Sequence, residues 1–159
     1  MQKSIRYIDI HGHINFDDYD ADREAVIARA ADAGVGMVAV GTDLETSRRA
    51  IELAEKYENI WACVGIHPTE VVESTESKVE SEGEATLRSE GDLIARRSLA
   101  SETDISVYED LRRLALHPRV VAIGECGLDY FHAEEKDFPA QIEAFERHII
   151  IANEVKKPL

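Results

Sequence analysis

Short apolar runs recur along this chain and alternate with longer segments of helical periodicity. The runs lie at Arg6–Ile10, Gly36–Gly41, Ile60–Ile66 and Val120–Glu125. They are mostly apolar rather than alternating between apolar and polar, which is typical of strands covered within a parallel sheet. We therefore expect four parallel strands.

The segments between these runs carry apolar residues at helical spacing. Helices are predicted at about 20–33, 44–57, 107–117 and 134–155. Gly34 is a typical residue after a helix, and Thr42 and Asp43 are residue types that cap a helix start. The alternation indicates an α/β protein, and two architectures remain open, a doubly wound sheet and a (β/α) barrel.

Residues 72–106 interrupt this alternation because they are rich in serine and acidic residues. We interpret them as an insertion between the third strand and its helix, flexible over residues 72–92. The whole chain, residues 1–159, is otherwise predicted to form a single domain.

The composition is that of an ordinary globular domain, but its charge is strongly acidic. Apolar residues make up 44% of the 159 residues, and 32 acidic residues against 18 basic ones give a net charge of −14. Such a charge argues against long-range attraction of polyanions. The chain shows neither a membrane-spanning apolar run nor a secretory signal, so we expect a cytoplasmic protein.

Polar side chains gather where the predicted strands end. His11 and His13 follow the first strand, His67 the third, and Glu125 the fourth. Both candidate architectures build their functional sites at this edge of the sheet. Asp9, His11 and His13 alternate along the strand and are expected on one face, where two imidazoles and a carboxylate suit a divalent metal.

Each of these residues also has a structural interpretation. A histidine pair can be a hydrogen-bonded structural feature, and His67 can be a turn residue bonded to the backbone and held by Pro68. Glu125 is costly to bury unless it is paired or bound to metal. Asp129 either orients a water or a metal-binding histidine, or it caps the next turn. The residue pattern leaves these alternatives open.

The remaining histidines and both cysteines are expected to be structural. His117 ends a helix before a proline, where an imidazole is favourable to the helix dipole. His132 and His148 have no partner at ligand spacing. Cys63 and Cys126 lie within apolar runs and form no paired metal or redox motif, so we expect buried, reduced thiols.

Taken together, four parts of the chain resemble one known family. They are Asp9-Ile-His-Gly-His13, Val40-Gly-Thr-Asp43 with Ser47-Arg-Arg-Ala50, Val64-Gly-Ile-His-Pro68 and Ala122-Ile-Gly-Glu-Cys-Gly-Leu-Asp-Tyr130. In this order they are similar to the TatD-family metal-dependent deoxyribonucleases of the amidohydrolase superfamily. The resemblance runs almost end to end outside residues 72–106.

The resemblance implies a TIM-type (β/α) barrel with one or two divalent metal ions, Mg²⁺, Mn²⁺ or Zn²⁺, at the C-terminal edge of its strands. His11 and His13 match metal ligands, and Glu125 matches a carboxylate that can bridge two metals. His67 matches a histidine that lines the substrate pocket, and Asp129 is a further candidate beside it. The implied reaction is hydrolysis of DNA phosphodiester bonds by metal-activated water.

Only about half of such a barrel can be counted here. A complete one takes about 250 residues, whereas four strand-helix units are recognisable in these 159 residues. The resemblance places further metal ligands and the general base on later strands that this chain does not contain. We therefore expect a partial barrel, either a fragment or a truncated product, that self-associates or pairs with a missing C-terminal half.

The sequence supports three functional hypotheses. In the first, the chain is the N-terminal half of a TatD-like DNase. In the second, it is a related amidohydrolase or a PHP-type phosphoesterase with another substrate, which the motifs Gly65-Ile-His-Pro68 and Gly124–Tyr130 make less favourable. In the third, it is a non-catalytic, metal-binding half-barrel remnant.

Overall fold

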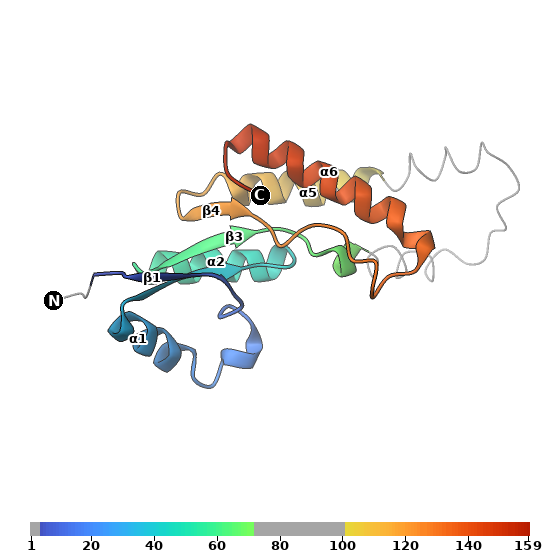
Figure 1. Ribbon diagram of the computed structural model, residues 1–159. Helices are drawn as coiled ribbons and strands as arrows, with labels where there is room; N and C mark the ends of the chain where they lie inside the picture. The colour runs from blue at the N-terminus through green and yellow to red at the C-terminus, as the bar shows by residue number, and fades with distance from the viewer. Residues whose placement is uncertain (1–3, 72–100) are drawn as a thin grey trace, which may run out of the picture.

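A computed structural model describes residues 4–71 and 101–159, and its centre is a parallel sheet (Figure 1). The sheet has the order β1-β2-β3-β4, formed by Tyr7–Gly12, Val35–Val40, Ile60–Val64 and Val120–Ile123. Strands that follow one another in the chain are neighbours in the sheet, as in a (β/α) barrel, whereas a doubly wound sheet reverses its strand order. The predicted parallel α/β fold is confirmed, and the sheet is not closed.

Four α-helices accompany the strands in the described part of the chain, α1 (Arg23–Ala33), α2 (Leu44–Lys56), α5 (Ser101–Ala115) and α6 (Phe138–Val155). Helices α1 and α6 begin later than the sequence predicts. A turn at residues 20–22, after the 3₁₀ helix η1 (Asp17–Tyr19), precedes α1, and the 3₁₀ helix η2 (Glu135–Asp137) precedes α6. Within the described ranges, none of the helices combines the length and the apolar character that a membrane crossing requires.

Helix α5 begins at Ser101, earlier than the predicted start at Val107. The prediction was wrong there because the first residues of the helix are polar and acidic, a composition that suits a solvated loop and also the first turns of a helix. The predicted flexible segment, residues 72–92, lies outside the described residues.

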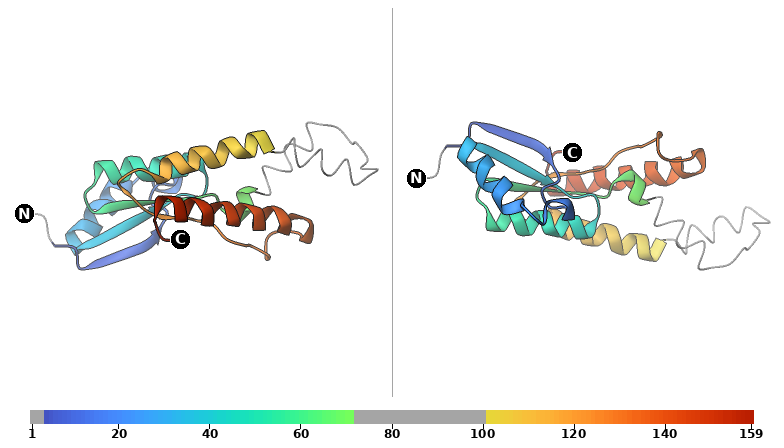
Figure 2. Two further views of the ribbon diagram at one scale, coloured as in Figure 1. Left: turned by 90° about the horizontal axis from the view of Figure 1, so that it is seen from above. Right: turned by 90° about the horizontal axis from the view of Figure 1, so that it is seen from below.

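The main hydrophobic core lies between the sheet and the helices, where α2 and α5 run side by side (Figure 2). Residues of β2 alternate between the two faces of the sheet. Met37 and Ala39 join the main core, whereas Val38 and Val40 join a smaller cluster with Cys63 on the other face. One face of the sheet is therefore much better covered than the other.

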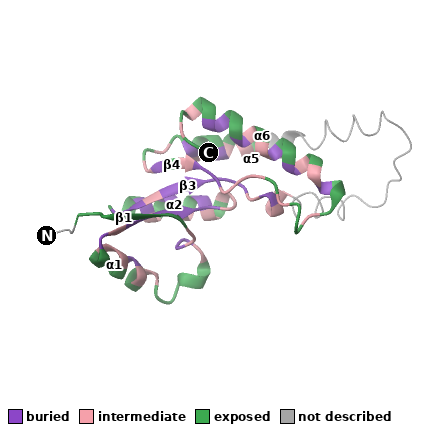
Figure 3. Ribbon diagram, viewed as in Figure 1, coloured by how far each residue is buried: buried purple, intermediate pink, exposed green. Residues whose placement is uncertain are grey.

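Strand β1 forms an exposed edge of the sheet (Figure 3). Its apolar side chains Tyr7, Ile8 and Ile10 are 67%, 54% and 77% exposed. At the opposite edge, the backbone N–H of Ile123 donates to the carbonyl oxygen of Pro158 at 2.9 Å, so the last residues lie along β4. Strand β1 is therefore an open edge of the described sheet.

Candidate metal centre

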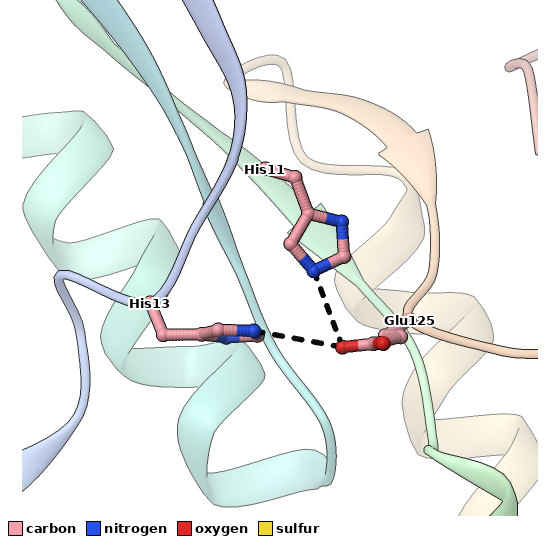
Figure 4. A group of neighbouring side chains, drawn as sticks. All are labelled: His11, His13 and Glu125. Atoms are coloured by element: carbon pink, nitrogen blue, oxygen red, sulfur yellow. Dashed lines mark ion pairs between the residues drawn. The ribbon is translucent and has the colours of Figure 1, made fainter.

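The candidate side chains meet at the C-terminal edge of the sheet. His11 lies in β1 and His13 just after it, His67 follows β3, and Glu125 follows β4. The Nε2 atoms of His11 and His13 lie 3.4 and 3.6 Å from Oε2 of Glu125 (Figure 4). Three groups from the first and last strands of the sheet therefore converge on one point.

The backbone after β4 crosses the end of β3 to bring Glu125 to the histidines. The N–H of Gly124 donates to the carbonyl oxygen of Val64, and the N–H of Glu125 donates to that of Gly41, each at 2.9 Å. A Cβ atom on Gly65 would lie only 2.3 Å from the carbonyl carbon of Gly124 and 2.7 Å from the nitrogen of Glu125. Glycine at position 65 is therefore required for this crossing.

We expect Gly65→Ala to displace Glu125 and to lower affinity for a divalent metal by about tenfold or more. The added methyl group overpacks this crossing and should also reduce the free energy of unfolding by about 1–3 kcal/mol. Gly12→Ala is the matched control, because the nearest atom to a Cβ at position 12 is 3.7 Å away. Calorimetric titration with Mn²⁺ measures both variants, and equal affinities would contradict this role for Gly65.

The cluster of His11, His13 and Glu125 fits a divalent cation. One ligand atom from each residue lies within 4.8 Å of the others. The two nitrogen–oxygen separations, 3.4 and 3.6 Å, are close to the roughly 3.4 Å between two ligands about 2.1 Å from a tetrahedral ion. All three side chains remain partly open to solvent, so an ion has a route of entry.

The hydrogen bonds of His13 prepare its ring for metal binding. Its Nδ1 lies 3.1 Å from the carbonyl oxygen of Val40, which can only accept, so Nδ1 carries the proton and Nε2 presents its lone pair to the cluster. The buried Asn15 donates to this same oxygen at 3.1 Å and to the carbonyl oxygen of Thr46 at 2.9 Å. Asn15 thus positions the partner of His13, a role that no sequence signal indicated.

Asp9 does not join the cluster, contrary to the expectation from strict strand alternation. The register between β1 and β2 shifts between Asp9 and Gly12. The Oδ1 atom of Asp9 instead accepts a hydrogen bond from the backbone N–H of His11 at 3.1 Å. The local irregularity of the strand therefore separates this carboxylate from the two imidazoles.

His67 also faces the Glu125 carboxylate, but with a protonated ring nitrogen, whereas His13 presents an unprotonated one. Its Nδ1 accepts from the backbone N–H of Thr69 at 3.3 Å and lies 2.6 Å from the Thr69 hydroxyl. The neutral ring therefore carries its proton on Nε2, which lies 3.6 Å from Oε1 of Glu125. This arrangement suits a hydrogen-bond donor to an anion better than a metal ligand.

Asp129 caps a turn, one of the two roles that the sequence left open. Its Oδ1 accepts from the backbone N–H groups of Phe131 and His132 at 2.9 and 3.0 Å, and its Oδ2 lies 2.6 Å from Nδ1 of His132. The His132 side chain, followed by these backbone bonds, lowers the pKa of Asp129 to about 2. Asp129 also lines a hollow of about 360 Å³ together with His67 and Glu125.

Both cysteines lie near this centre as free thiols. Burial raises the pKa of Cys63 to about 12 and that of Cys126 to about 11. Cys63 is buried, as expected, and its thiol donates to the carbonyl oxygen of Gly124 at 3.2 Å, whereas Cys126 is only partly buried. Neither thiol belongs to the group of ligand atoms that lie within 4.8 Å of one another, so the candidate centre consists of the imidazoles of His11 and His13 and the carboxylate of Glu125.

The parallel sheet and the histidine–carboxylate cluster define a class, an α/β protein of the barrel type with a candidate divalent-metal centre at the C-terminal ends of its strands. The family model described as "TatD related DNase" matches residues 8–159. The chain therefore belongs to the TatD-related DNase family, which confirms the resemblance seen in its motifs.

Individual relatives agree with this assignment. The "Uncharacterized metal-dependent hydrolase YabD" of Bacillus subtilis is 35% identical over 155 residues, covering 95% of this chain and 48% of the relative. The "3'-5' ssDNA/RNA exonuclease TatD" of Musicola paradisiaca is 34% identical over 153 residues, covering 95% and 47%. The crystal structure of YjjV, a TatD homologue from Escherichia coli, matches with a TM-score of 0.67 and 28% identity, covering 96% of this chain and 48% of that one.

The chain spans about half the length of the curated relatives that it matches. Its membership in a family of metal-dependent hydrolases and nucleases is shown by the family match and by the names of these relatives. The solved TatD homologue likewise supports the barrel-type arrangement of the strands.

Proposed function

We propose that this chain supplies the metal-binding half of a hydrolase that cleaves phosphodiester bonds in single-stranded DNA or RNA. The observation that carries the proposal is the convergence of His11, His13 and Glu125 on one point at the edge of the sheet. Relatives named as ssDNA/RNA exonucleases support this choice of substrate. The cytoplasmic location and the identity of the metal remain predictions.

The residues of this chain divide the work between binding the ion and binding the substrate. When bound, a divalent cation supplies a Lewis acid that activates water and offsets the charge of the phosphate. His11, His13 and Glu125 would hold it, and the Val40 carbonyl keeps His13 in the tautomer that this requires. The Nε2–H of His67 donates to a phosphate oxygen within the adjoining hollow. We assign no general base among the described residues.

The gene product that carries this chain is assayed on single-stranded DNA and RNA with Mg²⁺ or Mn²⁺. We expect nucleotide release that a chelator abolishes and that His11→Ala abolishes as well. p-Nitrophenyl phosphates and cyclic amides serve as parallel substrates, and faster turnover of these compounds would favour an amidohydrolase or PHP-type phosphoesterase instead. Hydrolysis that persists with the chelator and in His11→Ala would contradict the proposed metal site.

A second candidate function is metal binding without catalysis. The sheet of the described residues is open, and the cluster of His11, His13 and Glu125 offers three metal-ligand atoms, one from each residue. Such a site should bind metal weakly and position a nucleophile poorly, so we expect little or no turnover from the 159 residues alone. Metal binding without hydrolysis by the gene product itself would favour this remnant over the enzyme.

We also propose that the exposed edge of β1 is covered by further parallel strands, supplied by a second copy or by a C-terminal half. Exposed apolar strand edges associate readily, and Ile8 is 54% exposed there. Ile8→Lys should shift the 159-residue chain toward the monomer in sedimentation velocity runs at increasing concentration. Ile150→Lys, at an exposed position on α6, is the control. A wild-type chain that stays monomeric throughout would refute self-association.

A further inference from the structure

The hollow beside the candidate metal centre has an apolar wall that the proposed chemistry leaves unused. His67 and Glu125 line one part of it, and the segment from Leu128 to Phe131, between β4 and η2, lines another. Phe131 is 89% exposed and Tyr130 51% exposed. Two aromatic rings thus stand partly or largely open to solvent next to His67 and Glu125, the groups proposed to bind phosphate and metal.

The backbone of this turn is hydrogen-bonded, and both rings contact a neighbouring ring. The turn that carries Phe131 is closed by Asp129, which accepts from the backbone N–H of Phe131 at 2.9 Å. The rings of Phe131 and His132 lie nearly perpendicular, at 86°, with centroids 4.7 Å apart, and Nδ1 of His132 lies 2.6 Å from Oδ2 of Asp129. The Tyr130 ring packs on Phe138 with centroids 4.0 Å apart. This bracing lowers the entropy that a stacking ligand would cost.

Helix α6 anchors this turn through a buried side chain. The side-chain amide of the fully buried Gln141 accepts from the backbone N–H of Asp129 at 2.8 Å and donates to its carbonyl oxygen at 3.2 Å. The backbone of the wall is therefore tied at Asp129 to the buried side of α6.

We propose that Phe131, with Tyr130 beside it, is a stacking platform for a nucleobase of single-stranded nucleic acid. The inference rests on the proposed function, because it places the base next to the groups that would bind its phosphate. Stacking on aromatic rings tolerates every base, because each base has a π-face, and it does not need a basic protein surface. It therefore supplies affinity that a chain with a net charge of −14 cannot obtain from long-range attraction.

The test compares two oligonucleotides that share the same sugar-phosphate backbone, one with bases and one without. Fluorescence anisotropy measures binding of a labelled phosphorothioate thymidine tetramer and of a matched abasic tetramer to the full chain with Mn²⁺. Wild-type protein should bind the base-bearing tetramer about 5- to 100-fold more tightly. Phe131→Ala should bring the two affinities within about twofold of each other, whereas Phe131→Trp and the α6 surface control Ile150→Ala should keep the preference.

Two results would overturn the platform, namely equal binding of both tetramers by the wild type or an unchanged preference in Phe131→Ala. A change in sedimentation caused by Phe131→Ala would also overturn it, because the ring would then be packing against protein. A failure of the proposed function gives a different result. Hydrolysis is then absent, while the difference in affinity between the two tetramers persists.

Discussion

Glu125→Gln is expected to lower affinity for Mn²⁺ or Zn²⁺ by about a hundredfold or more and to remove metal-dependent hydrolysis by the gene product. Oε2 of Glu125 faces the Nε2 atoms of both His11 and His13, and its Oε1 faces His67. The substitution keeps the shape of the side chain but removes the only negative charge of the three-residue cluster. A cation would then meet two neutral imidazoles and a neutral amide.

The control for this prediction is Glu143→Gln, which makes the same chemical change on α6, where Glu143 pairs with Arg147. Calorimetric titration gives the metal affinity, and circular dichroism shows whether each variant keeps its fold. If Glu125→Gln bound metal as tightly as Glu143→Gln does, the assignment of Glu125 as a ligand would be wrong. His11→Ala and His13→Ala should each weaken binding in the same assay.

His148 is expected to make the protein acid-sensitive because its ring is fully buried and fully hydrogen-bonded in the neutral form. Its Nε2 accepts from the backbone N–H of Ile66 at 3.0 Å, and its Nδ1 lies 2.7 Å from the carbonyl oxygen of Ala144. A carbonyl can only accept, so the proton sits on Nδ1. The histidine thus ties α6 to the segment that leads into His67.

Burial lowers the pKa of His148 below the ordinary value of 6.5. In the unfolded chain the ring binds a proton near that value, so the folded state loses stability as the pH falls below 6.5 and keeps it in full above. The titratable Tyr108 on α5 packs edge-on against the ring, with centroids 5.7 Å apart. Burial lowers the pKa of His148, and the hydrogen bond to Ala144 opposes this shift in part.

Urea unfolding from pH 7.5 to pH 5 tests this role against two variants. His148→Gln offers a donor and an acceptor that do not titrate, so the wild type should lose stability relative to this variant as the pH falls. His148→Ala should be less stable at every pH by about 2–4 kcal/mol, because it leaves a cavity and an unpaired N–H at Ile66. Parallel pH profiles for wild type and His148→Gln would contradict the prediction.

The sequence anticipated the strands well because their apolar character is a local property. The runs ending at Ile10, Gly41, Ile66 and Glu125 correspond to β1, β2, β3 and β4, although their bounds differ by a few residues. Helix ends were less predictable. The start of α5 depended on the conformation of polar residues, whose composition does not distinguish a helix turn from a loop.

The meeting of Glu125 with His11 and His13 could be predicted only in outline. Parallel strands place their C-terminal ends at one edge, and that much follows from the pattern. The contact itself depends on the backbone after β4 passing over Gly65 to reach Gly41. The irregularity in β1 that separates Asp9 from the cluster is likewise a tertiary feature.

By itself, the sequence determined the class of fold, the edge of the sheet that carries the site, and the imidazole and carboxylate groups that meet there. These follow from hydrophobic periodicity and side-chain chemistry, which each segment carries locally. Only the tertiary structure decided that His13 presents Nε2, that His67 presents a proton, that Asp129 closes a turn, and that His148 is buried. Partners distant in the chain, the carbonyl oxygen of Val40 and the backbone N–H of Ile66, set the states of His13 and His148. His67 and Asp129 instead bond groups two or three residues away, and the sequence pattern did not specify the backbone conformation that brings those groups within reach.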